Sequence, residues 1–99
     1  MKTEDLAREV LSKLTDEGRT LATAESCTGG LLGKLLTDVP GASNAYKGGV
    51  ISYVSEVKHR LLGVEQETLD VCTAVSRETA HEMAKGAREA VKADVGVST

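Results

Sequence analysis

Residues 20–30 have the sequence TLATAESCTGG, and this stretch decides the fold class. The small and apolar residues from Thr20 to Ala24 predict a short strand that is buried on both faces. Gly29 and Gly30 follow within a few residues, and a leucine-rich segment comes next. The stretch therefore predicts a strand that passes through a tight turn into a helix, with Ser26 at the turn.

The segments on either side of this stretch have helical patterns. Residues 4–17 place their leucines and Val10 on one stripe, which predicts a helix with Thr3 as its N-cap. A second helix is expected from about residue 31 to Thr37, because Pro40 follows and cannot continue a helix. The first forty residues therefore predict helix, strand, turn and helix.

The remaining sequence continues the alternation of strands and helices. Residues 48–53 predict a second strand, and a short helix follows with Ser55 as N-cap. Ser76 is the expected N-cap of the best-patterned helix, and residues 94–98 predict a third strand. The core-facing stripe of that helix consists of Ala80, Met83, Ala84, Ala87 and Val91. This order predicts an α/β domain with α/β/α layers and a mostly parallel sheet.

Length and composition limit the possible functions. Ninety-nine residues form one domain, 1–99, and the formal net charge of -3 favours no contact with nucleic acid. Phe and Trp are absent, so a base-stacking platform is not expected. No apolar run approaches the ~18 residues of a membrane-spanning helix, and none resembles a signal peptide. We expect a cytoplasmic protein that contacts no membrane.

The residues that could bind a metal or form a disulfide are poorly spaced for either role. Cys27 and Cys72 are far apart and are expected to be free thiols. His81 resembles the start of a zinc-binding helix, but Lys85 stands where a second histidine would be needed. His59 has no spaced partner and is expected to be exposed. The sequence therefore predicts no metal site and no cofactor.

The turn after the first strand carries the most chemistry. Ser26 is placed to be a nucleophile, and the N–H groups near Thr28, Gly29 and Gly30 could hold an oxyanion or a phosphate. The alternative is that Ser26 or Thr28 is only a helix cap. Cys27 is a rival nucleophile, since a thiol at a helix N-terminus has a lowered pKa. We favour Ser26, with Cys27 as a small buried residue.

The chain resembles the C-terminal domain of the CinA family over nearly its whole length. The matching motifs are TAESCTGG at 23–30, LTDVPGAS at 36–43, GGVISY at 48–53, EVK at 56–58, LLGV at 61–64 and AVS at 74–76. The resemblance implies a nicotinamide mononucleotide deamidase, which forms nicotinate mononucleotide and ammonia in pyridine-nucleotide recycling. It also implies that residues 1–99 correspond to the N-terminal two-thirds of the family's domain, so that the fold is incomplete relative to the family.

The resemblance assigns roles to individual residues. Ser26 is implied as the nucleophile, Lys58 as the base and Tyr53 as a supporting group. The implied substrate-binding residues are Glu25, Thr28, Gly29 and Gly30. A lysine can act as a base only if its pKa falls from ~10.4 toward neutrality. If the first two strands are neighbours, their carboxyl ends bring these residues to one rim of the sheet.

Each of these residues also has an ordinary structural interpretation. Lys58 alone would be a solvated helix residue, and Tyr53 could pack against the sheet instead of relaying a proton or orienting the lysine. Glu25 could orient Thr28 or Lys58, or could be an exposed strand end.

The family's domain continues into a Gly- and Pro-rich loop and further strands, so we expect an exposed sheet edge here and homo-oligomer formation through it. The alternative function is a non-catalytic module that binds a nucleotide phosphate or another protein.

Overall fold

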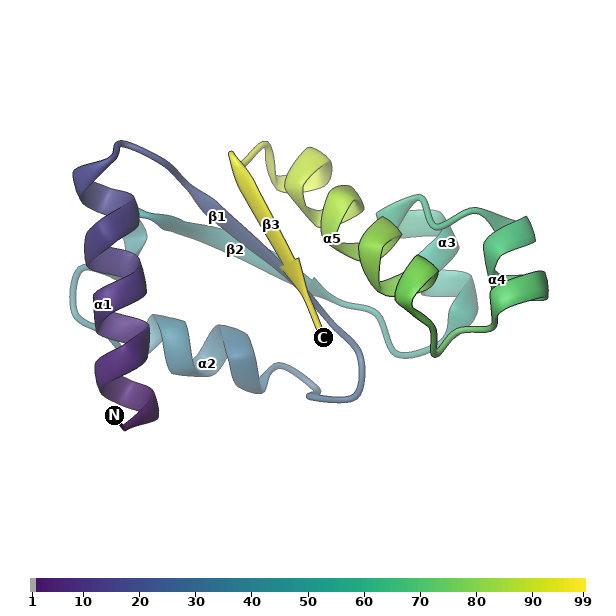
Figure 1. Ribbon diagram of the computed structural model, residues 1–99, viewed down its shortest axis with the longest axis horizontal. Coiled ribbons are helices and arrows are strands. Elements are labelled where there is room, and N and C mark those ends of the chain that lie inside the picture. Colours follow the sequence, from purple (N-terminus) through teal and green to yellow (C-terminus); the bar gives the residue numbers. More distant parts are fainter. Residues whose placement is uncertain (1) are drawn as a thin grey trace.

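The computed structural model describes residues 2–99 and has an α/β fold (Figure 1). The sheet consists of β1 (Leu21–Glu25), β2 (Tyr46–Ile51) and β3 (Val95–Ser98). The helices of the described residues are α1 (Thr3–Asp16), α2 (Leu31–Thr37), α3 (Ser55–Leu62), α4 (Gln66–Cys72) and α5 (Arg77–Val91), with a short 3-10 helix at Ala42–Asn44. The strands are parallel in the order β2-β1-β3, which confirms the predicted fold class.

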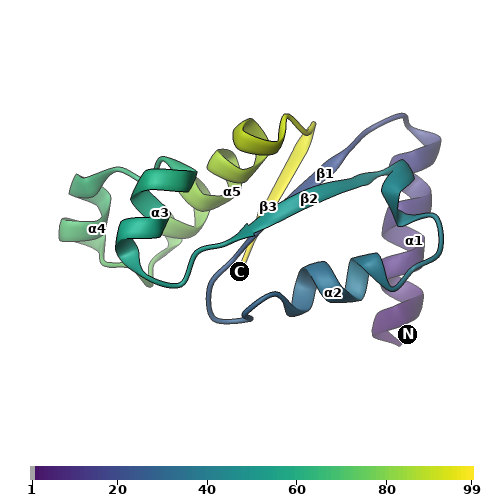
Figure 2. The same cartoon turned by 180° about the vertical axis from the view of Figure 1, so that it is seen from behind.

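Helices cover both faces of the sheet (Figures 1 and 2). One core joins α1 and α2 to β1 through residues that include Leu11, Leu21 and Leu36. The other joins α3, α4 and α5 to the opposite face of β1, where Ala22 and Ala24 are fully buried. Successive residues of β1 thus enter different cores, as expected for a central strand covered on both faces.

The small-residue stripe of α5 allows this helix to pack closely. Met83 and Ala87 are 3% and 0% exposed, as the spacing predicts. A Cβ atom on Gly86 would overlap the backbone carbonyl of Leu62 at the end of α3. Glycine at this position is therefore what lets α3 and α5 come into contact.

The helix caps agree with the sequence in one case of three. Ser76 accepts a hydrogen bond from the Thr79 N–H group at 3.1 Å and caps α5, as predicted. Thr3 and Ser55 are instead the first residues of α1 and α3, and neither helix has a side-chain cap. The predictions for Thr3 and Ser55 were wrong because the chain turns into each helix one residue earlier.

Two elements differ from the expected pattern. β2 spans Tyr46–Ile51, two residues earlier than predicted. Its pairing register with β1 shifts between Tyr46 and Gly48, and Gly48 has a φ of 143°. Helix α4 (Gln66–Cys72) was not predicted. Leu69 is its single buried residue, so no apolar stripe marks this helix in the sequence.

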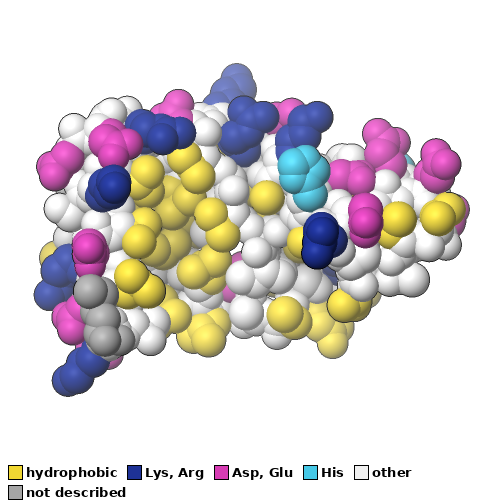
Figure 3. Space-filling view, in the orientation of Figure 1, with side chains coloured by type: hydrophobic (Ala, Val, Ile, Leu, Met, Phe, Trp, Pro, Cys, Tyr) yellow, Lys and Arg dark blue, Asp and Glu magenta, His cyan; other side chains and the backbone are white. Residues whose placement is uncertain are grey.

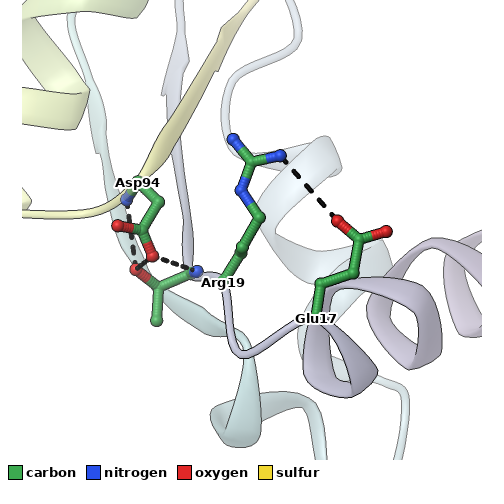
Figure 4. Close-up of polar contacts among 4 residues, drawn as sticks. Glu17, Arg19 and Asp94 are labelled. Carbon is green, nitrogen blue, oxygen red and sulfur yellow. Dashed lines mark hydrogen bonds and ion pairs between the residues drawn. The ribbon is translucent and has the colours of Figure 1, made fainter.

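Hydrogen bonds fix the amino ends of β1 and β3 (Figure 4). The Asp94 carboxylate accepts bonds from the backbone N–H and the hydroxyl of Thr20, at 2.8 and 3.1 Å. These bonds lower the pKa of Asp94. Arg19, next to Thr20, forms a surface ion pair with Glu17 at 3.8 Å. The register of β3 against β1 is thus fixed at the end remote from Ser26.

β3 pairs only with β1 among residues 2–99, so its outer side is an edge of the sheet. An apolar groove of about 220 Å³ lies between this strand and the helices α1 and α2. Its lining includes Leu6, Val10, Leu32 and Val97, and Figure 3 shows hydrophobic side chains gathered on this face. No helix of the described part combines the length and hydropathy needed to cross a bilayer.

Candidate active site

The carboxyl ends of β1 and β2 lie side by side, which meets the condition for their residues to share one rim. Glu25 is paired with Ile51, so Ser26 and Ser52 follow at the same edge of the sheet. The chain then enters α3, whose first turn places Lys58 over this edge. Residues far apart in the sequence therefore meet where open α/β sheets bind ligands.

Lys58 is in hydrogen-bond contact with Ser26. Its Nζ atom lies 3.1 Å from the Ser26 hydroxyl oxygen and 2.9 Å from each of the carbonyl oxygens of Ser52 and Tyr53. The carbonyls accept only, so they fix two of the Lys58 protons. The third hydrogen-bonding direction of Lys58 Nζ points to the Ser26 hydroxyl. A protonated Lys58 donates a hydrogen bond there, whereas a neutral Lys58 presents its lone pair. The geometry suits removal of the serine proton by a neutral lysine.

Burial lowers the pKa of Lys58. The residue is 2% exposed, and none of the ion pairs among residues 2–99 involves it. Taking an ammonium out of water disfavours its charged form, and here only neutral carbonyl and hydroxyl dipoles compensate. The interpretation of Lys58 as a solvated helix residue is therefore wrong.

Glu25 is buried at the same edge but faces α2. Its carboxylate accepts hydrogen bonds from the Leu32 and Gly33 N–H groups, both at 2.8 Å, and from the Thr28 hydroxyl at 2.7 Å. Burial alone would raise the pKa of Glu25, but these donors, with the Gly30 N–H, lower it below its ordinary value. Glu25 therefore orients Thr28, as one interpretation predicted, and its 3% exposure excludes the exposed strand end.

The turn uses most of its own N–H groups. Gly29 donates to the Ser26 carbonyl, and Gly30 contributes to the donors around Glu25. The backbone hydrogen bonds within residues 2–99 leave the N–H groups of Cys27 and Thr28 without an acceptor. The expected oxyanion donors thus shift toward the residues directly after Ser26.

The end of β3 completes the rim. The Thr28 hydroxyl gives its single proton to Glu25, so at 2.6 Å it accepts a hydrogen bond from the Thr99 hydroxyl. The Thr99 carbonyl accepts from the Ser26 N–H at 3.1 Å. Ser26 is therefore held from β3 as well as from its own turn.

Tyr53 contacts Lys58 through its backbone, not its side chain. The side chain is 76% exposed, and its hydroxyl makes no hydrogen bond with any residue of 2–99. The alternative interpretation, in which Tyr53 packs against the sheet, does not agree with this exposure.

Cys27 is exposed, contrary to prediction, and lies in the turn that follows β1. His59 is exposed as expected, and the described residues hold no cluster of potential metal ligands.

Sequence reasoning missed the two backbone carbonyls that hold Lys58. No residue type marks such a contact, because every residue carries a carbonyl. The sequence also gave no sign that the Ser52 hydroxyl is fully buried without a hydrogen-bond partner within the described residues.

The protein is a three-layered α/β domain. A serine and a buried lysine are in contact at the carboxyl edge of its sheet. Residues 3–99 match the family model described as the CinA C-terminal domain. The chain belongs to the CinA family.

Relatives in sequence carry competence-related names. The chain is 53% identical over 96 residues to a putative competence-damage inducible protein of Caldanaerobacter subterraneus, and 51% identical to a CinA-like protein of Leptospira borgpetersenii. Each alignment covers 97% of this chain and 23% of the relative. The chain thus spans about a quarter of the length of these curated relatives.

Solved structures show the same fold. The competence damage-inducible protein A of Klebsiella pneumoniae superposes with a TM-score of 0.92 at 38% identity, covering 95% of this chain and 58% of that one. The competence/damage inducible protein CihA of Agrobacterium tumefaciens gives 0.87 at 41% identity, covering 94% and 55%. The solved relatives therefore contain substantial further sequence beyond the matched region.

Proposed function

We propose that this chain hydrolyses the carboxamide of nicotinamide mononucleotide to nicotinate mononucleotide and ammonia, in cytoplasmic pyridine-nucleotide recycling. The contact of 3.1 Å between Lys58 Nζ and Ser26 Oγ carries the proposal, because it pairs a nucleophile with a buried base. The choice of amide follows from the resemblance to the CinA family.

Ser26 attacks the amide carbon while neutral Lys58 takes the hydroxyl proton. The Cys27 and Thr28 N–H groups are the donors available for the tetrahedral oxyanion. Lys58 then gives its proton to the departing nitrogen, and ammonia leaves an acyl ester on Ser26. A water molecule, activated by the again neutral Lys58, hydrolyses this ester and restores the serine.

The lowered pKa of Lys58 matters for the rate. A lysine with a pKa of ~10.4 is neutral in only about one molecule in a thousand near pH 7.4. Each unit by which burial lowers the pKa raises that fraction about tenfold. Burial without a counter-charge therefore increases the fraction of Lys58 that is in the reactive, neutral form.

The test is ammonia release from nicotinamide mononucleotide by the purified chain, with Ser26→Ala and Lys58→Met beside it. Both variants should lose activity about a thousandfold or more. The matched control is Lys85→Met on the exposed face of α5, which should keep full activity. Activity retained in Ser26→Ala would overturn the proposal.

A second candidate function rests on the unpaired edge of β3. We propose that a second copy of this chain pairs there and covers the apolar groove beside Val97, which is 41% exposed. Sedimentation should show a dimer that Val97→Lys disrupts, whereas Leu61→Lys on α3 leaves it intact.

Phosphate binding at the start of α2 is less favoured, since the Glu25 carboxylate already accepts hydrogen bonds from the N–H groups there.

A further inference from the structure

Exposed apolar side chains lie at the rim beside Ser26 and Lys58. Ile51 is 56% exposed, Ser52 is fully buried and Tyr53 is 76% exposed. This alternation continues the pattern of β2 past its last residue, so Ile51 and Tyr53 face the same side. Ser52 faces the interior between them.

The Ile51 side chain lies against the turn that carries Ser26. A Cβ atom on Gly30 would stand 3.0 Å from Ile51 Cδ1. The side of the chain shared by Ile51 and Tyr53 is therefore the side of this turn. We call Gly30, Ile51 and Tyr53 together the rim shelf.

The Lys58 amine has no free hydrogen-bonding direction for the Tyr53 hydroxyl. Its nitrogen is tetrahedral, and beyond its own carbon it has three directions. The Ser52 carbonyl, the Tyr53 carbonyl and the Ser26 hydroxyl occupy all three. The phenol is thus needed neither to orient the amine nor to take its proton, and the aromatic face of Tyr53 remains available.

We propose that the rim shelf binds the planar, positively charged ring of the amide substrate, with Tyr53 stacking on it. This inference rests on the proposed function, in which the ring is a pyridinium and its carboxamide is the reacting group. A cation over a tyrosine face is attracted by the negative face of the ring. Tyr53 is therefore a specificity-determining residue that acts through its ring.

The kinetic test compares Tyr53→Phe with Tyr53→Leu. Both replace an exposed side chain, so folding should be unaffected, and circular dichroism checks this. Tyr53→Phe keeps the ring and should retain kcat and KM within about twofold. Tyr53→Leu should raise KM roughly tenfold and leave kcat nearly unchanged, as expected for lost stacking. A large loss of kcat in Tyr53→Phe would overturn the inference and indicate a proton-transfer role for the hydroxyl.

A binding test separates this inference from the reaction itself. Ser26→Ala, which cannot turn over, is titrated by calorimetry with nicotinamide mononucleotide and with its reduced form, whose ring is uncharged. The oxidised form should bind roughly tenfold more tightly, and adding Tyr53→Leu should remove that preference. Tyr53-dependent binding without turnover by the wild-type chain would refute the reaction and support the shelf. Equal binding of both forms, or no binding, would refute the shelf.

Discussion

Two buried ionisable residues, Glu25 at the end of β1 and Lys58 in α3, lie at the same edge of the sheet and differ in their surroundings. They are 3% and 2% exposed. Glu25 receives hydrogen bonds from several donors, which hold it as an anion, whereas Lys58 meets only carbonyls and a hydroxyl. Although the two residues are equally buried, Glu25 organises the fold, whereas the charged form of Lys58 is only weakly stabilised. Only the second is suited to exchange protons.

Loss of Glu25 should have the largest effect on stability. Glu25→Ala leaves the Leu32 and Gly33 N–H groups and the Thr28 hydroxyl without their buried acceptor. Each unsatisfied group costs about 1–3 kcal/mol, so the free energy of unfolding should fall by about 3 kcal/mol or more. Urea denaturation measures this, with Glu56→Ala on the surface of α3 as the control. An equal, small effect in both variants would refute the structural role of Glu25.

Loss of Lys58 should affect stability much less. Lys58→Met removes a buried cation that has no counter-charge, which stabilises the fold, but it also leaves the Ser52 and Tyr53 carbonyls without their donor. The two effects oppose each other, so the free energy of unfolding should change by about 1 kcal/mol or less, although ammonia release is lost. The same urea titration decides this, and a destabilisation as large as that of Glu25→Ala would show that Lys58 is held for structure.

The two residues should also give stability different dependences on pH. The lowered pKa of Glu25 contributes stability above its unfolded value of ~4.3, and this is lost as pH falls through the folded pKa. The lowered pKa of Lys58 means that the unfolded chain binds its proton more tightly, so stability rises with pH up to ~10.4. Thermal unfolding of Glu25→Gln should lose the acid dependence and that of Lys58→Met the alkaline one. Unchanged profiles would contradict both assignments.

The smallest effect is expected at Asp94, a carboxylate that accepts similar bonds at the exposed end of the sheet. Its pKa is lowered by the Thr20 hydrogen bonds, but solvent surrounds it. Asp94→Asn should therefore shift the acid unfolding curve much less than Glu25→Gln does. An equal shift would show that burial is not what distinguishes the two carboxylates.

The alternating strands and helices predicted the parallel sheet, and the family resemblance singled out Ser26 and Lys58 as candidate site residues. The sequence left open whether the first two strands are neighbours, and it is their pairing that brings the two residues together. Side-chain orientation in the turns was harder to predict. Cys27 lies in a turn where no periodic pattern separates inside from outside, and it proved exposed. Tyr53 contacts Lys58 only through its backbone carbonyl. Contacts to backbone carbonyls leave no mark in a sequence.

The central claim is that buried Lys58, in its neutral form, activates Ser26, and the pH dependence of ammonia release from nicotinamide mononucleotide tests this claim most directly. For the wild-type chain, kcat/KM should rise with pH through an apparent pKa below ~10.4. Ser26→Ala and Lys58→Met should be inactive throughout, while Lys85→Met follows the wild-type curve. A pH-independent rate, or a rate that survives either substitution in the rim, would contradict the account.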